Sequence, residues 1–433
     1  PQGKTTVFKA QLRILPSVAF ISAFLNNTPV VVIFAPIIKH WAKSVNLPAT
    51  KFLIPLSYVT ILGGICTLIG TSTNLVVHGM ILEAGFEGFS MFELGKVGIF
   101  IAIAGIIYIF LFSKRLLPDA RPDTAVPDEE IEEGEKFHRV EAVLGARFPG
   151  INKKLKDFNF QRHYGAEVKE IKTRNGQRFV SNLEEVVLHE GDTLVVMADD
   201  TFIPTWGESS VFVLLTNGNE PDTTGKKKRW FALLLLVLMI VGATVGELPI
   251  TKEMFPDIKL DMFFFVSITT IIMAWTNLFP ARKYTKYISW DILITIACAF
   301  AISKAMVNSG VADSVAKFII GLSDDYGPHV LLAMVFIITN LFTELITNNA
   351  AAALAFPLAL SISAQLGVSP TPFFVVICMA ASASFSTPIG YQTNLIVQGI
   401  GNYKFTDFVR IGLPLNIITF LISIILIPLI WNF

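Results

Sequence analysis

Charged side chains are scarce in this chain of 433 residues. Lysine, arginine, aspartate and glutamate make up 16% of it, and the 34 basic and 34 acidic residues cancel, whereas an average soluble domain is roughly 25% charged. A chain without excess positive charge is not suited to nucleic acid, so no such partner is expected. The three cysteines, Cys66, Cys298 and Cys378, lie in apolar segments without metal-site spacing, which excludes a disulfide or zinc scaffold.

Long apolar segments are abundant in the chain. It is 53% hydrophobic and contains 36 phenylalanines, and many of its apolar runs approach the ~20 residues that cross a bilayer as a helix. These runs cover residues 14–38, 51–69, 97–113, 230–246, 262–279, 288–307, 329–346, 350–366, 370–400 and 411–432. The sequence therefore predicts a polytopic α-helical membrane protein whose surroundings are the lipid bilayer. No nucleophile–base pair or metal-ligand cluster stands out in the polar part, so an enzyme is not expected.

A charged insertion divides the chain, which predicts three parts: a first membrane repeat at 1–114, a soluble module at 115–228 and a second membrane repeat at 229–433. The stretches "EAVLGA", "AEVKEIK" and "TLVVMAD" alternate as short strands do, and "NKKLKDFNFQRHYG" predicts a short amphipathic helix ending at Gly165. The insertion is thus expected to be a small α/β unit. Because the chain begins with Pro1 and little precedes its first polar motif, we expect the natural N-terminus to be missing.

Basic segments flank this insertion. "SKRLLPDAR" precedes it and "GKKKRW" ends it. Cytoplasmic loops carry an excess of lysine and arginine, so the insertion is predicted to be cytoplasmic. We expect the chain to be an integral protein of the plasma membrane, a bacterial inner membrane, with residues 115–228 inside the cell.

Two distant segments of the chain repeat each other. "TLIGTSTNLVVHG" begins at Thr67 and "TPIGYQTNLIVQG" at Thr387, and eight of their thirteen positions are identical. Upstream lie "FLNNTPVVVIFAP" and "LITNNAAAALAFP", in which a proline follows Asn27 and Asn348 by the same interval of nine residues. Repeats in membrane proteins usually form two related halves around one site. The charge pattern suggests that these halves are inverted relative to each other.

The repeated segments place polar residues where lipid demands that backbone groups find internal partners. "LNNT" and "ITNNA" predict the tips of re-entrant hairpins, and "GTSTN" and "GYQTN" predict breaks in discontinuous helices. Amide and carbonyl oxygens suit a hard cation such as Na⁺, and helix N-termini suit an anion. Polar residues also join membrane helices without binding anything, but two matched pairs of motifs favour a binding site.

One acid lies close to these motifs. Glu344 precedes Thr347 by three residues, and an ionisable residue within a membrane helix is a functional candidate. We expect it to support the hairpin from outside the site. A proton carrier and a packing residue are the alternatives.

The same residues carry a family resemblance. "NNT" from Asn26 to Thr28, "TNN" from Thr347 to Asn349 and the preceding "TELITNN" resemble the hairpin tips of the divalent anion/sodium symporter family, a branch of the ion transporter superfamily. The resemblance covers the membrane part. It implies two inverted repeats with re-entrant hairpins and broken helices, a homodimer, and elevator-type alternating access driven by Na⁺.

This resemblance implies site residues by position. The first sodium site would use Ser22, Asn26, Asn27 and the backbone of Gly70, and the second would use Thr343, Thr347, Asn348 and the backbone of Gly390. The anion would lie between Thr28, Thr71, Ser72, Asn349, Tyr391 and Gln392. Supporting positions are Thr73, Asn74, Glu344, Thr387, Thr393 and Asn394. "STN" and "QTN" replace the family's Pro-Pro-Asn beside the substrate, so the anion need not be a dicarboxylate.

The insertion has a resemblance of its own. "FNFQRHYGAEVKEIKTRNGQRF" and "LHEGDTLVVMAD" resemble the C-terminal (TrkA-C/RCK-C-like) module of regulators of potassium conductance. This implies either a dimerisation domain or a site for a small-molecule or nucleotide regulator. Symporters with this module resemble the branch usually assigned to sulfate. The leading hypothesis is therefore sodium-coupled sulfate symport. The alternatives are a dicarboxylate/sodium symporter, a sodium/proton antiporter using Glu344, and a ligand-gated channel.

Overall fold

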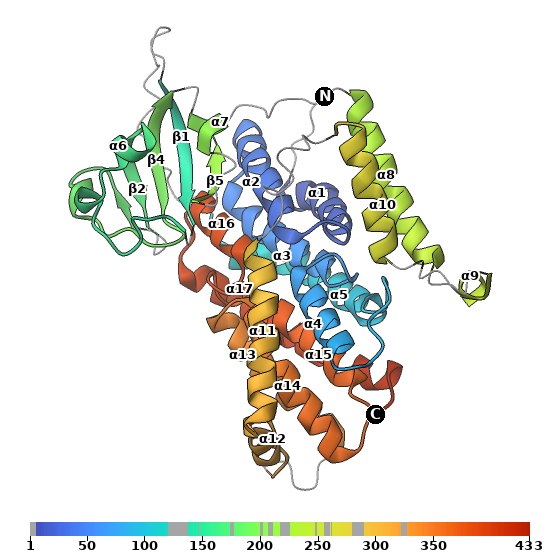
Figure 1. Cartoon of the computed structure of the whole chain (residues 1–433). Helices are drawn as coiled ribbons and strands as arrows, with labels where there is room; N and C mark the ends of the chain where they lie inside the picture. The colour runs from blue at the N-terminus through green and yellow to red at the C-terminus, as the bar shows by residue number, and fades with distance from the viewer. Residues whose placement is uncertain are drawn as a thin grey trace.

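The structure is a computed structural model of the whole chain, and Figure 1 shows its course. The residues that it describes are 6–119, 137–145, 147–173, 177–199, 202–206, 211–216, 226–246, 249–254, 260, 262–278, 290–321 and 327–433. Helices make up both ends of the chain, and a small sheet lies in its middle.

The helices before the sheet form one packed group. They are α1 (Val7–Ser22), α2 (Asn27–Ser44), the 3₁₀ turn η1 (Ala49–Lys51), α3 (Leu53–Gly64), α4 (Ser72–Glu83) and α5 (Gly95–Leu116). Every residue of α3 is buried. The helix packs against α1, α2 and α5, which makes it the centre of the group.

The helices after the sheet run to the end of the chain. They are α8 (Lys226–Gly246), α9 (Pro249–Met254), α10 (Met262–Trp275), α11 (Trp290–Asn308), α12 (Val311–Gly321), α13 (Gly327–Leu345), α14 (Asn348–Leu366), α15 (Thr371–Ser382), α16 (Gln392–Gly401) and α17 (Phe405–Ile430). Packing here resembles that of the first group. Helix α15 contacts α13, α14 and α17, just as α3 contacts α1, α2 and α5.

Several helices are suited to a bilayer. In the described part of the chain, five are long and apolar enough to cross a membrane, or six if α11 and α12, which meet at a bend of 72°, form one span. Helices α3, α4, α15 and α16 have 12, 12, 12 and 10 residues. At 1.5 Å per residue, each covers only about half of a hydrocarbon core of ~30 Å. The chain is interrupted between α3 and α4 and between α15 and α16, where the sequence predicts broken helices.

The hairpin tips are also interrupted as predicted. Helix α1 ends at Ser22 and α2 begins at Asn27, while α13 ends at Leu345 and α14 begins at Asn348. The inverted relation of the two halves stays a prediction, but one arrangement favours it. Helix α2 packs against α16, and α4 packs against α14. In Figure 1 the α2–α16 pair lies beside the sheet, and α14 extends away from it.

The middle of the chain is a small α/β module. Its elements are β1 (Phe137–Leu144), η2 (Leu155–Asp157), α6 (Phe160–Tyr164), β2 (Glu167–Lys172), β3 (Arg178–Phe179), η3 (Leu183–Glu185), β4 (Thr193–Asp199), α7 (Phe202–Trp206) and β5 (Phe212–Thr216). The strands pair antiparallel in the order β3-β2-β4-β1-β5. The three stretches expected to be strands lie in β1, β2 and β4. Fifteen buried side chains form a core for this module.

The single helix expected over "NKKLKDFNFQRHYG" is wrong in its length. The stretch forms the turn η2 and then the five-residue helix α6, which ends at Gly165 with φ +72° as the sequence predicts. Phe158, between the turn and the helix, has an extended backbone with φ −123° and ψ 98°, and both Phe158 and Phe160 are buried. Asn159 then begins α6 by accepting a hydrogen bond from a backbone N–H.

A buried lysine fixes the point where the chain leaves α5 for the module. Lys51 is 3% exposed, and its Nζ donates to the carbonyl oxygens of Lys114 at 2.8 Å and Leu117 at 2.5 Å. Asp119 lies 3.1 Å from the same ammonium. The last carbonyls of a helix lack partners within the helix, and a cation near them is favourable.

Replacing Lys51 with methionine should therefore destabilise the protein. The buried Leu117 carbonyl and the partly buried Lys114 carbonyl would lose their donor, which costs about 1–3 kcal/mol in the free energy of unfolding. Thermal unfolding of the detergent-solubilised protein measures this. The matched control is Lys169→Met, because Lys169 is 53% exposed and pairs with Glu167 at 2.7 Å. Such surface pairs contribute roughly 0–1 kcal/mol. Equal midpoints for both variants would contradict the role given to Lys51.

Candidate functional site

Four helices begin at one place in the membrane part. They are α2, α4, α14 and α16, which pack as the pairs α2–α16 and α4–α14. The residues before them are Asn26, Thr71, Thr347 and Tyr391, and none of these makes a side-chain capping hydrogen bond. The first backbone N–H groups of each helix therefore lack a side-chain cap, and each N-terminus carries partial positive charge.

Hydrogen bonds join the two halves of the chain across these helix starts. The bonds are Thr28 Oγ1 to Gln392 Oε1 at 3.3 Å, Thr71 Oγ1 to the Tyr391 hydroxyl at 3.0 Å, and Ser72 Oγ to Asn349 Oδ1 at 3.3 Å. The structure thus brings together all six residues expected around the anion. Thr28 and Ser72 are half-buried, while Thr71 and Tyr391 are buried.

A cluster of oxygens surrounds Asn27 in the first hairpin. Asn27 is fully buried. The end of its amide that meets Ser22 Oγ at 2.8 Å also lies 3.0 Å from the Thr60 carbonyl oxygen and 3.2 Å from the Gly70 carbonyl oxygen. The other end lies 2.5 Å from the Tyr391 hydroxyl. With Oδ1 toward the carbonyls, the oxygens form a set that suits a hard cation; with the amide turned over, Nδ2 donates to them.

The second hairpin has a matching cluster. Thr343 Oγ1 donates to Asn348 Oδ1 at 2.8 Å, the distance of the Ser22–Asn27 bond, and it also lies 2.6 Å from the Ala381 carbonyl oxygen. Ser384 Oγ donates to the Thr343 carbonyl oxygen at 3.4 Å. Any side chain at Gly390 would collide with these groups. Neutral oxygens again gather beside a helix N-terminus.

The two helix breaks are held by the same hydrogen bonds. Thr67 Oγ1 accepts from the Gly70 N–H at 3.2 Å, and Thr387 Oγ1 accepts from the Gly390 N–H at 3.2 Å. An asparagine in the helix that follows each break donates a second hydrogen bond to the same threonine. Asn74 Nδ2 donates to the Thr67 carbonyl at 2.9 Å, and Asn394 Nδ2 donates to the Thr387 carbonyl at 3.1 Å.

The sequence profile of the citrate transporter family matches residues 4–365 and, in a second overlapping match, residues 258–433. The chain belongs to the citrate transporter family. Its apolar helices and this family make it an integral membrane transporter rather than an enzyme.

Individual relatives span most of the chain. An uncharacterized transporter of Synechocystis sp. is 30% identical over 497 residues, which cover 95% of this chain and 81% of that protein. A putative sulfur deprivation response regulator of Chlamydomonas reinhardtii is 28% identical over 512 residues, covering 96% and 85%. Sodium/sulfate cotransporter 2 of the same alga is 31% identical over 281 residues, covering 65% of this chain and 31% of that protein.

Glu344 lies behind the second cluster in this member of the citrate transporter family. Its Oε1 accepts from the Ser386 N–H at 2.9 Å and from Asn416 Nδ2 at 2.7 Å. Its carbonyl oxygen accepts from Thr387 Oγ1 at 3.0 Å. The residue therefore links α13 to the break between α15 and α16 and to α17.

The remaining expected residues divide into two groups. Thr73 Oγ1 donates to Asn349 Oδ1 at 3.2 Å, and Thr393 Oγ1 accepts from Ser57 Oγ at 2.9 Å. These two contact the site or its supports. Asn26, which is half-buried, and Thr347, which is exposed, precede α2 and α14 but do not belong to either hydrogen-bonded cluster.

Several residues of the candidate site were not predicted from the sequence. Thr67 aligns with Thr387, which was expected, so the repeat alone could have identified it. Ser57 donates to Asn394 Oδ1 at 2.7 Å, and Asn416 contacts Glu344. Neither lies in a repeated motif, so no sequence signal pointed to them. The Thr60 carbonyl is a backbone group, which side-chain identity does not reveal.

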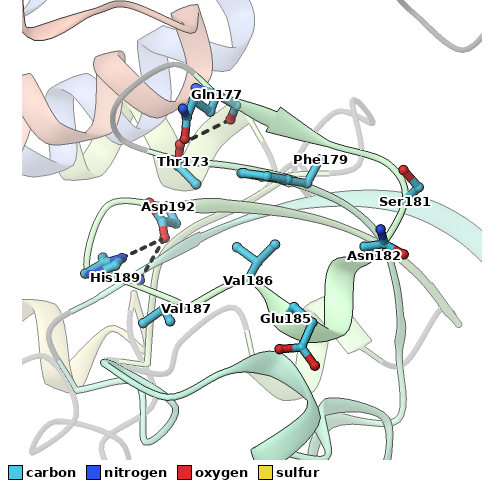
Figure 2. Close-up of a pocket in the computed structure, with 10 residues that line it drawn as sticks. All are labelled: Thr173, Gln177, Phe179, Ser181, Asn182, Glu185, Val186, Val187, His189 and Asp192. Atoms are coloured by element: carbon cyan, nitrogen blue, oxygen red, sulfur yellow. Dashed lines mark hydrogen bonds and ion pairs between the residues drawn. The ribbon is translucent and has the colours of Figure 1, made fainter.

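The module has a cavity of about 590 Å³ at one end of its sheet. Figure 2 shows ten residues around it: Thr173, Gln177, Phe179, Ser181, Asn182, Glu185, Val186, Val187, His189 and Asp192. Asp192 is buried and accepts from the His189 backbone N–H at 2.7 Å. The exposed carboxylate of Glu185 is held by two lysines, whose hydrogen bonds and charges lower its pKa to about 2. Seven of these ten residues are polar, and Phe179, Val186 and Val187 are apolar.

Proposed function

We propose that this chain is a sodium-coupled symporter of a small divalent anion, with sulfate the first candidate. The observation that carries the proposal is the meeting of four helix N-termini without side-chain caps, two from each half. Backbone N–H groups and helix dipoles bind anions at such ends. The four motifs contain no lysine or arginine, so the charge of a bound anion must be balanced by dipoles and by co-bound cations.

The two oxygen clusters supply places for those cations. Ser22, Asn27 and the Gly70 carbonyl form the first, and Thr343, Asn348 and the backbone near Gly390 form the second. Neutral oxygens without sulfur or imidazole favour Na⁺ over transition metals. The Asn27 amide suits a carrier in both states, because its oxygen can face a bound ion and its N–H can face the same carbonyls once the ion has left.

The anion sits between the clusters in this proposal. Thr28, Ser72 and Asn349 are short polar side chains whose hydroxyl and amide groups can donate to oxyanion oxygens. The pairs α2–α16 and α4–α14 both begin at the site. The first pair extends toward the module, and α14 of the second pair extends away from it. This arrangement supports alternating access of the elevator type, in which the helices around the site move together.

Relatives favour sulfate as the anion. Three Chlamydomonas reinhardtii relatives are named as sodium/sulfate cotransporters, one of them as probable. A citrate or dicarboxylate is the second candidate, because the family profile is described as a citrate transporter. Polar residues in place of prolines at the substrate positions favour the smaller and more polar sulfate.

Uptake into proteoliposomes tests the proposal. Labelled sulfate should accumulate only with an inward sodium gradient, and unlabelled sulfate should compete better than citrate or succinate. Potassium replacing sodium is the control. Sulfate flux that does not depend on sodium would refute the coupling. Stronger competition by citrate would identify citrate, rather than sulfate, as the preferred substrate.

The module is proposed to face the cytoplasm and to regulate transport. The basic residues around it support this orientation. Its cavity falls within the ~300–1,000 Å³ of small-molecule sites, which supports a small regulator, and we propose that the transporter works as a homodimer. Isothermal titration of the purified protein with nucleotides tests regulator binding, and mass photometry in detergent tests the dimer.

A further inference from the structure

The module is joined to the membrane part by a cluster of three charges, of which Lys172 is buried and Lys39 and Glu141 are half-buried. Glu141 on β1 lies 3.0 Å from Lys39 Nζ on α2 and 3.3 Å from Lys172 Nζ on β2. The side chains of Lys39, Glu141 and Lys172 are 26%, 18% and 7% exposed. Burial alone would raise the pKa of Glu141, but the two ammonium groups outweigh it and lower the pKa to about 2. At neutral pH this carboxylate is therefore charged and paired.

A second contact joins the module to α16. Gly399 of α16 lies so close to β4 that a Cβ there would come within 2.6 Å of Thr193 Oγ1. Gly191, which has φ +84°, lies against the side chain of Leu395. Two glycines, one on each side, thus allow the surfaces to approach closely.

Both helices contacted by the module begin at the candidate anion site. At 1.5 Å per residue, Lys39 lies about 16 Å along α2 from Thr28, and Gly399 lies about 10 Å along α16 from Gln392. Figure 1 shows the sheet beside α2 and α16, and α8 and α10 on the other side of the molecule. The module therefore sits on the far ends of two helices that carry site residues.

We propose that the module surface formed by Glu141, Val143, Lys172, Gly191 and Thr193 is a permanent docking surface for α2 and α16, so that the module moves with the anion site during transport. The inference rests on the proposed function, because it concerns motion during transport. A regulator bound to the module would then act directly on the moving helices. The cavity supports such a path, because His189 and Asp192 flank the Gly191 that contacts α16.

Cross-linking tests whether docking is permanent. Thr193 on β4 and Leu395 on α16 are replaced by cysteines in a protein whose native cysteines are replaced by alanine, and a short, reducible bifunctional thiol reagent joins the two positions. We expect sodium-dependent sulfate uptake to stay within about twofold of the untreated protein, because the cross-link joins two surfaces that already move together. Uptake that disappears on cross-linking and returns on reduction would overturn the inference.

A second measurement tests what holds the surfaces together. In the same double-cysteine protein, adding Glu141→Gln should lower the cross-linking yield about tenfold, because it leaves the buried ammonium group of Lys172 and the half-buried one of Lys39 without an anion. The matched control is Glu185→Gln, since Glu185 is also held by two lysines, at 2.8 and 2.6 Å, but lies at the module's cavity. Equal yields in the two variants would overturn the docking role of Glu141. If the untreated parent shows no sodium-dependent uptake, the proposed function fails, and these yields still decide the docking.

Discussion

Replacing Asn27 with alanine should raise the sodium concentration needed for half-maximal sulfate uptake by about tenfold to a hundredfold. The substitution removes the amide that meets Ser22, the Thr60 and Gly70 carbonyls and the Tyr391 hydroxyl. A hydrogen bond or ligand to a charged group contributes about 1.5–3 kcal/mol, and each 1.4 kcal/mol changes an equilibrium constant about tenfold. Initial uptake rates at varied sodium and saturating sulfate give the value.

A structural explanation of the same loss must be excluded. Asn402 provides a matched control, because it is another asparagine of the membrane part but follows α16 at its far end, in a left-handed conformation with φ +52°. Replacing Asn402 with glycine keeps that conformation accessible and should leave the sodium dependence unchanged. An Asn27→Ala protein with normal sodium dependence would show that the first oxygen cluster does not bind the coupling ion.

Replacing Gly70 with alanine should lower sulfate uptake by about tenfold to a hundredfold. A Cβ on Gly70 would lie 2.7 Å from the Cα and 2.9 Å from the carbonyl carbon of Gly64, so two backbone segments must separate. Overpacking of this kind costs about 1–3 kcal/mol, and here it moves the Gly70 carbonyl away from Asn27. Uptake measured at equal amounts of reconstituted protein tests this expectation.

Gly79 gives the matched substitution in the following helix. A Cβ on Gly79 would meet Phe300 Cζ at 3.6 Å, which is an ordinary contact. Alanine favours a helix over glycine by up to about 1 kcal/mol, so Gly79→Ala should keep full uptake and equal or greater thermal stability. If Gly70→Ala also keeps full uptake, the break between α3 and α4 does not hold the site in the way described.

The sequence predicted those parts of the candidate site that occur in both repeated segments. Asn27 and Asn348, and Gly70 and Gly390, stand at matching places in two repeated segments, and their hydrogen bonds match as well. Helix breaks were predictable because polar, glycine-containing segments cannot continue an apolar helix in lipid without partners.

Other features depend on folding between distant segments. The hydrogen bond from Ser57 to Asn394 joins residues 337 positions apart, and the pair of Lys39 and Glu141 joins residues 102 apart. Neither has a local pattern. The length of helix α6 was overestimated because the buried Phe158 has an extended backbone that separates the turn η2 from the helix. Tertiary packing determines these contacts and element boundaries, and the periodicity of a single sequence carries no information on such packing.

The two proposed sodium sites are electrically unequal. Glu344 follows Thr343 of the second cluster directly, whereas Ala23 occupies the equivalent place after Ser22 in the first. A fixed negative charge attracts a nearby cation more strongly in a partly buried setting than in water. In the proposed mechanism, an ionised Glu344 therefore makes the second half bind its sodium ion first and release it last, which gives the transport cycle an order of loading that two identical halves could not provide.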